Sequence, residues 1–64
     1  MIMTLRQLSN FMWYVQKVRV QDVNKNVLFD GDNYQLSSVN CNGICDKLVC
    51  GFGADDNILI VTVK

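Results

Sequence analysis

The most apolar stretch of the chain is residues 58–63, where nearly every position is hydrophobic. Alternate side chains of a strand point to opposite faces, and the two faces here are Ile58, Ile60 and Thr62 against Leu59, Val61 and Val63. A strand with one solvated face alternates apolar with polar residues. We therefore expect this segment to be the central strand of a sheet that is covered on both faces.

Residues 4–12 carry the signals of a helix that packs on this sheet. Thr4 and Gln7 stand at the spacing of a capping box, in which each side chain satisfies the backbone N–H of the other. The apolar stripe that follows recurs at helical spacing, at Leu5, Leu8 and Met12. The pattern predicts one short N-terminal helix that begins at Thr4.

Two further stretches predict strands. In residues 16–30, Val18 and Val20 alternate with polar residues, and the turn-forming sequence 24–26 precedes a second apolar run, which is typical of a β-hairpin. Residues 47–52 predict a third strand, with Leu48, Cys50 and Phe52 on one face. Residues 55–57 then turn into the final strand.

The predicted fold is α+β, with one N-terminal helix packed on a four-stranded, mainly antiparallel sheet built of two β-hairpins. The last strand is expected at the centre, paired to the first. Residues 34–46, which include a short helical turn over residues 34–38, are the segment left to cover the second face of the sheet. Few large apolar residues lie in that segment, which favours a second chain as the cover for Leu59, Val61 and Val63 if these face away from the helix.

Length and composition restrict the classes of function. The chain of 64 residues is expected to form one domain, residues 1–64, with a thin core. Its formal net charge is zero, which disfavours nucleic acid as a partner, since that binding needs clustered Lys and Arg. No stretch approaches the roughly 20 apolar residues of a membrane span, and the three cysteines fit a reducing compartment. We expect a cytoplasmic protein with no membrane contact.

Residues 11–15 are five consecutive large apolar residues at the end of the predicted helix. They cannot all point inward from one short helix, so at least one of Phe11, Trp13 and Tyr14 is expected near the surface. The simplest interpretation is a core plug with an amphipathic rim. The alternative is an aromatic patch that binds a partner.

The chain lacks a recognisable catalytic or metal-binding set. It has no His and no Glu, so a general base would have to be Asp, Lys, Cys or Tyr, and no pair of these has an informative spacing. Cys41, Cys45 and Cys50 lack the fourth ligand and the spacing of a zinc site. We predict no enzyme activity, no metal and no cofactor. A redox role for Cys41 and Cys45 stays open.

The sequence resembles small proteins of phages and mobile elements of Gram-positive bacteria. The resemblance lies in the order of three segments before the final strands, which are Met3-Thr4-Leu5-Arg6-Gln7-Leu8, Lys17-Val18-Arg19-Val20 and Val27-Leu28-Phe29-Asp30-Gly31. It implies an accessory setting in which small proteins bind a host or phage protein, and it implies no activity. The cysteine-bearing loop departs from the pattern.

The leading functional hypothesis is a non-enzymatic protein–protein interaction module that acts as a homodimer or binds another protein. The candidate contact residues are Phe11, Trp13, Tyr14, Leu59 and Val61. One alternative is a small protein that binds single-stranded nucleic acid through Tyr14, Lys17 and Arg19, where an aromatic ring lies near alternating cations. A second alternative is a protein that sequesters a small ligand at a subunit interface.

Overall fold

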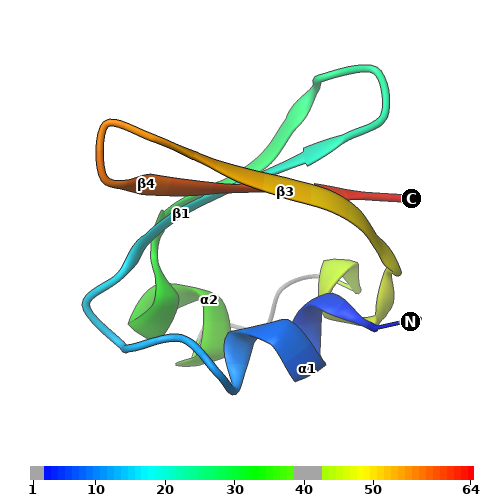
Figure 1. The fold of residues 1–64 in the computed structure, drawn as a ribbon. Helices are drawn as coiled ribbons and strands as arrows, with labels where there is room; N and C mark the ends of the chain where they lie inside the picture. The colour runs from blue at the N-terminus through cyan, green and yellow to red at the C-terminus, as the bar shows by residue number, and fades with distance from the viewer. Residues whose placement is uncertain (1–2, 39–42) are drawn as a thin grey trace.

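The computed structural model describes residues 3–38 and 43–64, and it places a four-stranded sheet over a layer of short helical segments (Figure 1). The elements are α1 (Leu5–Ser9), β1 (Lys17–Asp22), β2 (Val27–Asp32), α2 (Asn33–Ser38), the 3-10 helix η1 (Ile44–Asp46), β3 (Val49–Asp55) and β4 (Ile58–Val63). The predicted α+β class is confirmed.

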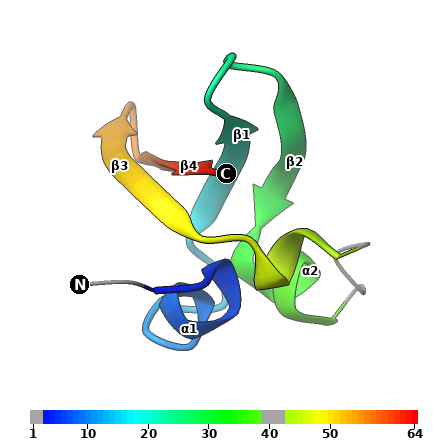
Figure 2. The same ribbon diagram turned by 90° about the vertical axis from the view of Figure 1, so that its right-hand side faces the viewer.

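The strands lie in the order β2-β1-β4-β3 (Figure 2). β1 pairs with β2 and β3 pairs with β4 in antiparallel fashion, whereas β1 and β4 are parallel. The sheet is therefore mixed and mostly antiparallel. The last strand is central and pairs with the first, as the sequence predicts, and β2 and β3 form the two edges.

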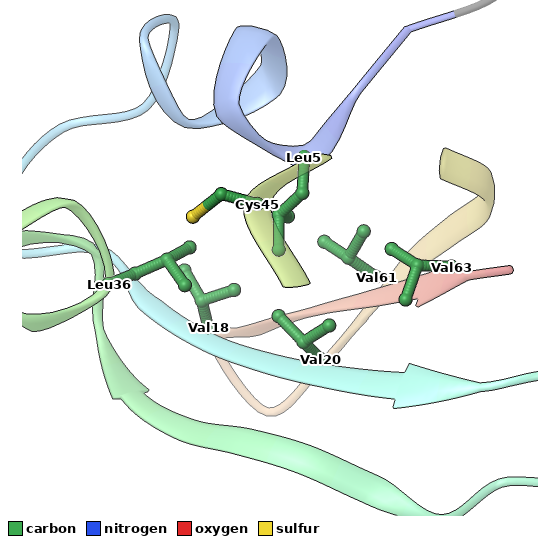
Figure 3. Packing of buried hydrophobic residues seen from close by; sticks show 7 residues of the cluster. All are labelled: Leu5, Val18, Val20, Leu36, Cys45, Val61 and Val63. Atoms are coloured by element: carbon green, nitrogen blue, oxygen red, sulfur yellow. The ribbon is translucent and has the colours of Figure 1, made fainter. Parts of the chain in front are cut away.

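Among the described residues, seven side chains form the buried core between the sheet and the helical layer (Figure 3). β1 and β4 supply four valines, and the helical segments supply the rest, which are Leu5, Leu36 and Cys45. Val61 and Val63 are fully buried, and Leu59 packs against the same cluster. The face of β4 that bears these three residues is thus the face that the helices cover.

This orientation corrects the expectation that residues 34–46 cover the second face of the sheet. In the described part of residues 34–46, α2 and η1 contribute to the same layer as α1 (Figure 1). Within residues 3–38 and 43–64, no helix lies over the opposite face of the sheet, where Ile58, Ile60 and Thr62 are half-buried. We call this the open face. The local pattern of β4 could not distinguish the two faces, because both are apolar.

The N-terminal helix begins where the sequence predicts but ends three residues earlier. Thr4 is the N-cap, and its capping box with Gln7 is complete. The helix stops at Ser9, after which the N–H groups of Phe11 and Met12 donate to carbonyl oxygens three residues back, at Leu8 and Ser9. Residues 10–16 are therefore a loop and not the last turn of a longer helix.

Both hairpin turns use residues with a left-handed backbone. Lys25, with φ of 68°, takes this conformation in the first turn, where the sequence favoured the neighbouring asparagines. In the second turn Asp56 and Asn57 have φ of 52° and 68°, the pattern of a tight two-residue hairpin. Because this turn is so short, β3 continues to Asp55, three residues beyond its predicted end.

The alternation predicted for the third strand is wrong because a register shift interrupts it. Val49 is opposite Val63, whereas Gly51 is opposite Thr62, so Cys50 is an extra residue in the strand. Phe52 is consequently opposite Val61 and lies on the covered face. Val49 and Phe52 share that face, contrary to the predicted pattern.

Candidate protein-binding surface

The loop between α1 and β1 presents a row of large apolar side chains to solvent. The exposed fractions are 78% for Phe11, 81% for Trp13, 66% for Tyr14 and 79% for Val15. Within residues 11–15, which we call the aromatic loop, Met12 alone packs against the core. The core-plug interpretation is therefore wrong, and the loop forms an exposed patch.

A buried asparagine holds the aromatic loop in place. Asn33, at the start of α2, has no exposed surface. Its side-chain Nδ2 donates to the carbonyl oxygens of Ser9 at 3.0 Å and Met12 at 3.1 Å, and its Oδ1 accepts from the Ser9 hydroxyl at 2.6 Å. This network fixes the exit from α1, since a buried polar group must keep its hydrogen bonds.

The backbone of α2 anchors the other end of the loop. The N–H groups of Asn33 and Tyr34 donate to the carbonyl oxygens of Gln16 at 2.8 Å and Tyr14 at 2.9 Å. The rings of Tyr14 and Tyr34 meet edge to face, with centroids 5.9 Å apart. Tyr34, itself exposed, extends the apolar patch beyond the loop. The aromatic side chains are thus displayed on a backbone that is hydrogen-bonded at both ends.

A groove separates the aromatic loop from the β3–β4 hairpin. It has a volume of about 590 Å³, and its lining residues are Phe11, Met12, Trp13, Gln16, Ala54, Asn57, Ile58 and Leu59. The side chain of Gln16 spans it by donating to the Asn57 carbonyl oxygen at 3.1 Å. A second hollow of about 260 Å³ lies at the start of β3, against Met3 and Phe52. Val49 packs against the core, but beyond it the edge strand β3 overhangs the helical layer.

The candidate contact residues from the sequence fall into two groups. Phe11, Trp13 and Tyr14 are exposed on one loop, and Leu59 lines the adjacent groove. Val61 is fully buried in the core and presents no surface to a partner. Sequence reasoning missed Phe52, which is 70% exposed on the overhanging strand. The two glycines that flank Phe52 indicate a strand with little packing around it. They were the sequence signal that could have indicated the exposure of Phe52.

The residues of the nucleic-acid hypothesis do not form a basic surface. Arg19 is ion-paired with Asp30 across the β1–β2 hairpin, with Nε and Oδ2 3.5 Å apart. Lys17 is opposite Asp32 in the same register. Each cation on the open face thus has an acidic neighbour on β2, which reduces the positive potential that phosphate binding requires.

The cysteines supply no recognisable site within the described residues. Cys41 lies outside them, so a role that involves it stays a prediction. Cys45 belongs to the core, and Cys50 is an exposed free thiol on β3. In residues 3–38 and 43–64, no group of three His, Cys, Asp or Glu side chains is placed to hold a metal ion.

Comparisons with family models, with curated proteins and with solved structures found no match for this chain. In the part of the chain that the structure describes, no helix is long and apolar enough to cross a membrane.

Proposed function

We propose that this protein is a non-enzymatic protein-interaction module whose main contact surface is the aromatic loop. The observation that carries the proposal is the exposure of Phe11, Trp13, Tyr14 and Val15, each about two-thirds or more open to solvent. Monomeric soluble proteins seldom leave such a contiguous patch uncovered. Aromatic residues are also the type most enriched at the energetic centres of protein interfaces.

Preorganisation makes this patch suited to binding. Each aromatic ring has few rotatable bonds, so it loses little entropy when a partner covers it. The backbone beneath the rings is already fixed by Asn33 and by the N–H groups at the start of α2. A partner would therefore meet a surface that needs little ordering, which raises the affinity obtained from a given contact area.

The magnitudes indicate that several of these side chains act together. Burying one Phe or Trp removes about 150–250 Å² from water, which corresponds to roughly 4–6 kcal/mol. Association itself costs about 4–15 kcal/mol. One ring therefore offsets only the lower end of this cost, so a stable complex needs several of these side chains.

A comparative capture experiment tests the proposal. The tagged chain and its Tyr14→Ala variant are used to recover proteins from the cells that produce it, with Val27→Ala as the matched control. Val27 is also exposed but lies on β2, away from the loop. We expect a partner that wild type and Val27→Ala retain and that Tyr14→Ala loses. Equal recovery by all three chains, or recovery of nothing by any, contradicts the proposal.

Trp13 gives a second measurement, since it is the single tryptophan of the chain. Titration with a recovered partner should move its fluorescence emission to shorter wavelength as the ring leaves water. From the resemblance to phage and mobile-element proteins, we further propose that the partner is encoded by the host or by the same element. Sequencing the gene's neighbours tests that setting.

A further inference from the structure

The two edges of the sheet are built differently. On β2, Asp30 and Asp32 place charges along the edge strand, and Gln35 of α2 exchanges hydrogen bonds with Asp32 through its side chain and its backbone N–H. On β3, residues 49–54 contain neither a charged residue nor a proline. Natural proteins use charges, prolines, β-bulges and covering segments to stop edge strands from pairing. Charges and α2 protect β2, whereas on β3 the Cys50 bulge and the contacts with residues 3 and 4 protect only the start of the strand.

The unprotected part of β3 has clear limits. At the start of β3, the N–H of Val49 donates to the Met3 carbonyl oxygen at 2.8 Å. Thr4 forms an isolated antiparallel β-bridge with Leu48 next to it. The Cys50 bulge follows, and from Gly51 to Asp55 the strand has β4 on one side. A Cβ atom added at Gly51 or Gly53 would meet nothing within 4 Å. Five residues of strand therefore remain open to a second strand.

We propose that this open segment pairs antiparallel with the same segment of a second copy of this chain, about a two-fold axis at Gly53. The proposal rests on the proposed function, because it makes a second copy one of the partners of the module. In this register Gly51 is opposite the partner's Asp55, and Phe52 is opposite the partner's Ala54. The result is one continuous eight-stranded sheet with both helical layers on the same side.

Charge complementarity identifies the second copy as the occupant. The start of β3 is basic, because Lys47 precedes it and Lys64 exchanges backbone hydrogen bonds with Leu48. The end of β3 is acidic, at Asp55 and Asp56. Within residues 3–38 and 43–64, none of these four charged side chains forms an ion pair. Lys47 nevertheless lies near enough to Asp22 of β1 to contribute, after the hydrogen bonds from Asn26, to the lowered pKa of that carboxyl. Antiparallel pairing brings the acidic end of each copy toward the basic end of the other.

The separations are compatible with this attraction. Asp56 would lie opposite the partner's Cys50, three residues from the partner's Lys47, which is about 10 Å along a strand. The long lysine side chain shortens that distance, and the Debye length at physiological ionic strength is about 8 Å. Each exposed pair is expected to change the dimer dissociation constant about two- to fivefold.

Side-chain sizes are complementary in the same register. Phe52 and Ala54 both lie on the covered face, opposite Val61 and Leu59 of β4. The large ring of each copy would therefore meet the small side chain of the other. Ala54 also lines the 590 Å³ groove, so the partner's Phe52 would lie at the mouth of that groove and cover it. The same two contacts form twice, as a two-fold interface requires.

Engineered disulfides test the register. In a Cys50→Ser background, Gly53→Cys places two thiols on the axis, where directly opposed Cα atoms are about 4.5–5.5 Å apart and fit a disulfide. Asp55→Cys is the matched control, since its two copies would be about 13 Å apart along the strands. We expect a covalent dimer from Gly53→Cys under mild oxidation and none from Asp55→Cys. Equal cross-linking of both, or none in either, overturns the proposal.

Sedimentation equilibrium of the unmodified chain at micromolar concentration gives the independent measurement. We expect twice the monomer mass of 7.3 kDa, and the double variant Asp55→Lys with Asp56→Lys should weaken the dimer about tenfold. If the wild-type chain is a monomer, the self-pairing proposal is wrong. This holds even if β3 pairs with a strand of another protein. Tyr14→Ala should remain a dimer while it loses partner capture, so the two proposals fail separately.

Discussion

Asn33 links the hydrophobic core to the exposed aromatic loop. Its side chain is buried without any ionic partner, yet it makes three hydrogen bonds to residues more than twenty positions earlier. Those bonds end α1 at Ser9 and turn the chain so that Phe11 and Trp13 point to solvent. Together with the backbone hydrogen bonds from the start of α2, this one polar side chain holds residues 11–15 as a surface loop.

Replacing Asn33 with Ala should destabilise the fold strongly. A buried polar group that loses its partner costs about 1–3 kcal/mol, and here more than one group is affected, so we expect a loss of about 2–4 kcal/mol. The urea midpoint at constant m-value measures the change. Asn24→Ala is the control, because that exposed side chain should matter by about 0.5 kcal/mol or less. An Asn33→Ala midpoint equal to that of wild type contradicts the anchoring role.

Asp22 should make the β1–β2 turn sensitive to acid. Its Oδ1 accepts from the N–H groups of Asn26 at 2.9 Å and Asn24 at 2.8 Å. The hydrogen bonds from Asn26 are the main cause that lowers the pKa of this carboxyl below its ordinary value. Since the folded pKa lies below the unfolded one, the stabilisation is present above the unfolded pKa and is lost as the pH falls through the folded pKa.

The comparison of wild type with Asp22→Asn tests this dependence. Urea midpoints measured from neutral pH down to about pH 2 should fall more steeply in wild type, because the variant has no carboxylate to protonate at this turn. At neutral pH the variant should be less stable than wild type. Parallel curves for the two chains would show that the turn does not depend on the charge.

At the scale of elements, the β3–β4 turn determines how far the edge strand extends. Asn57 adopts a left-handed backbone at the second turn position, where glycine is favoured. Asn57→Gly should therefore stabilise the hairpin by about 0.5–1 kcal/mol, and the Asn57 carbonyl that accepts from Gln16 is retained. Thermal unfolding measures the gain. Asn24→Gly, at a position without positive φ, should give no gain, and a similar gain from both would refute this explanation.

The elements that the sequence predicted are those with local signals. The capping box at Thr4 places the start of α1, and alternation places β1 and β4. The end of α1 depends on Asn33, which is distant in the chain, so residues 4–12 could not reveal it. The covered face of β4 could not be predicted either, because its two faces are equally apolar. The bulge at Cys50 likewise depends on pairing with β4.

Only part of the candidate site could be predicted from the sequence, because the exposure of a side chain depends on tertiary contacts. Phe11, Trp13 and Tyr14 stand out by residue type, so the sequence names them as contact candidates. Their exposure follows from the early end of α1, which is a tertiary effect. Val61 was a candidate because the helix-facing side of β4 was unknown, and the structure buries it.

At the scale of the whole molecule, the small core leaves little reserve of stability. The buried cluster among the described residues contains Leu36 from α2, which is fully buried. Leu36→Ala should cost about 2–5 kcal/mol, a large part of the total for so small a domain. Leu48→Ala is the control, because that side chain is 37% exposed. Urea unfolding should show a much larger loss at Leu36, and equal losses would contradict the assigned core.

The molecule thus has one covered and one open face, a protected edge at β2 and an open edge at β3. Its most exposed large apolar side chains lie on the aromatic loop and at Phe52, whereas Val23 and Val27 are exposed singly on the β1–β2 hairpin. Although its core is thin, the domain exposes several of its largest apolar side chains to solvent. That distribution supports binding as the role of the molecule.

Site-specific photo-cross-linking in the producing cells tests whether the aromatic loop is the binding surface. A photoreactive amino acid is placed at Tyr14 in one chain and at Val27 in another, both exposed positions on the same fold. We expect a discrete cross-linked protein from position 14 and none from position 27. Identical products from both positions, or no product from position 14, would contradict the claim that the aromatic loop is the binding surface.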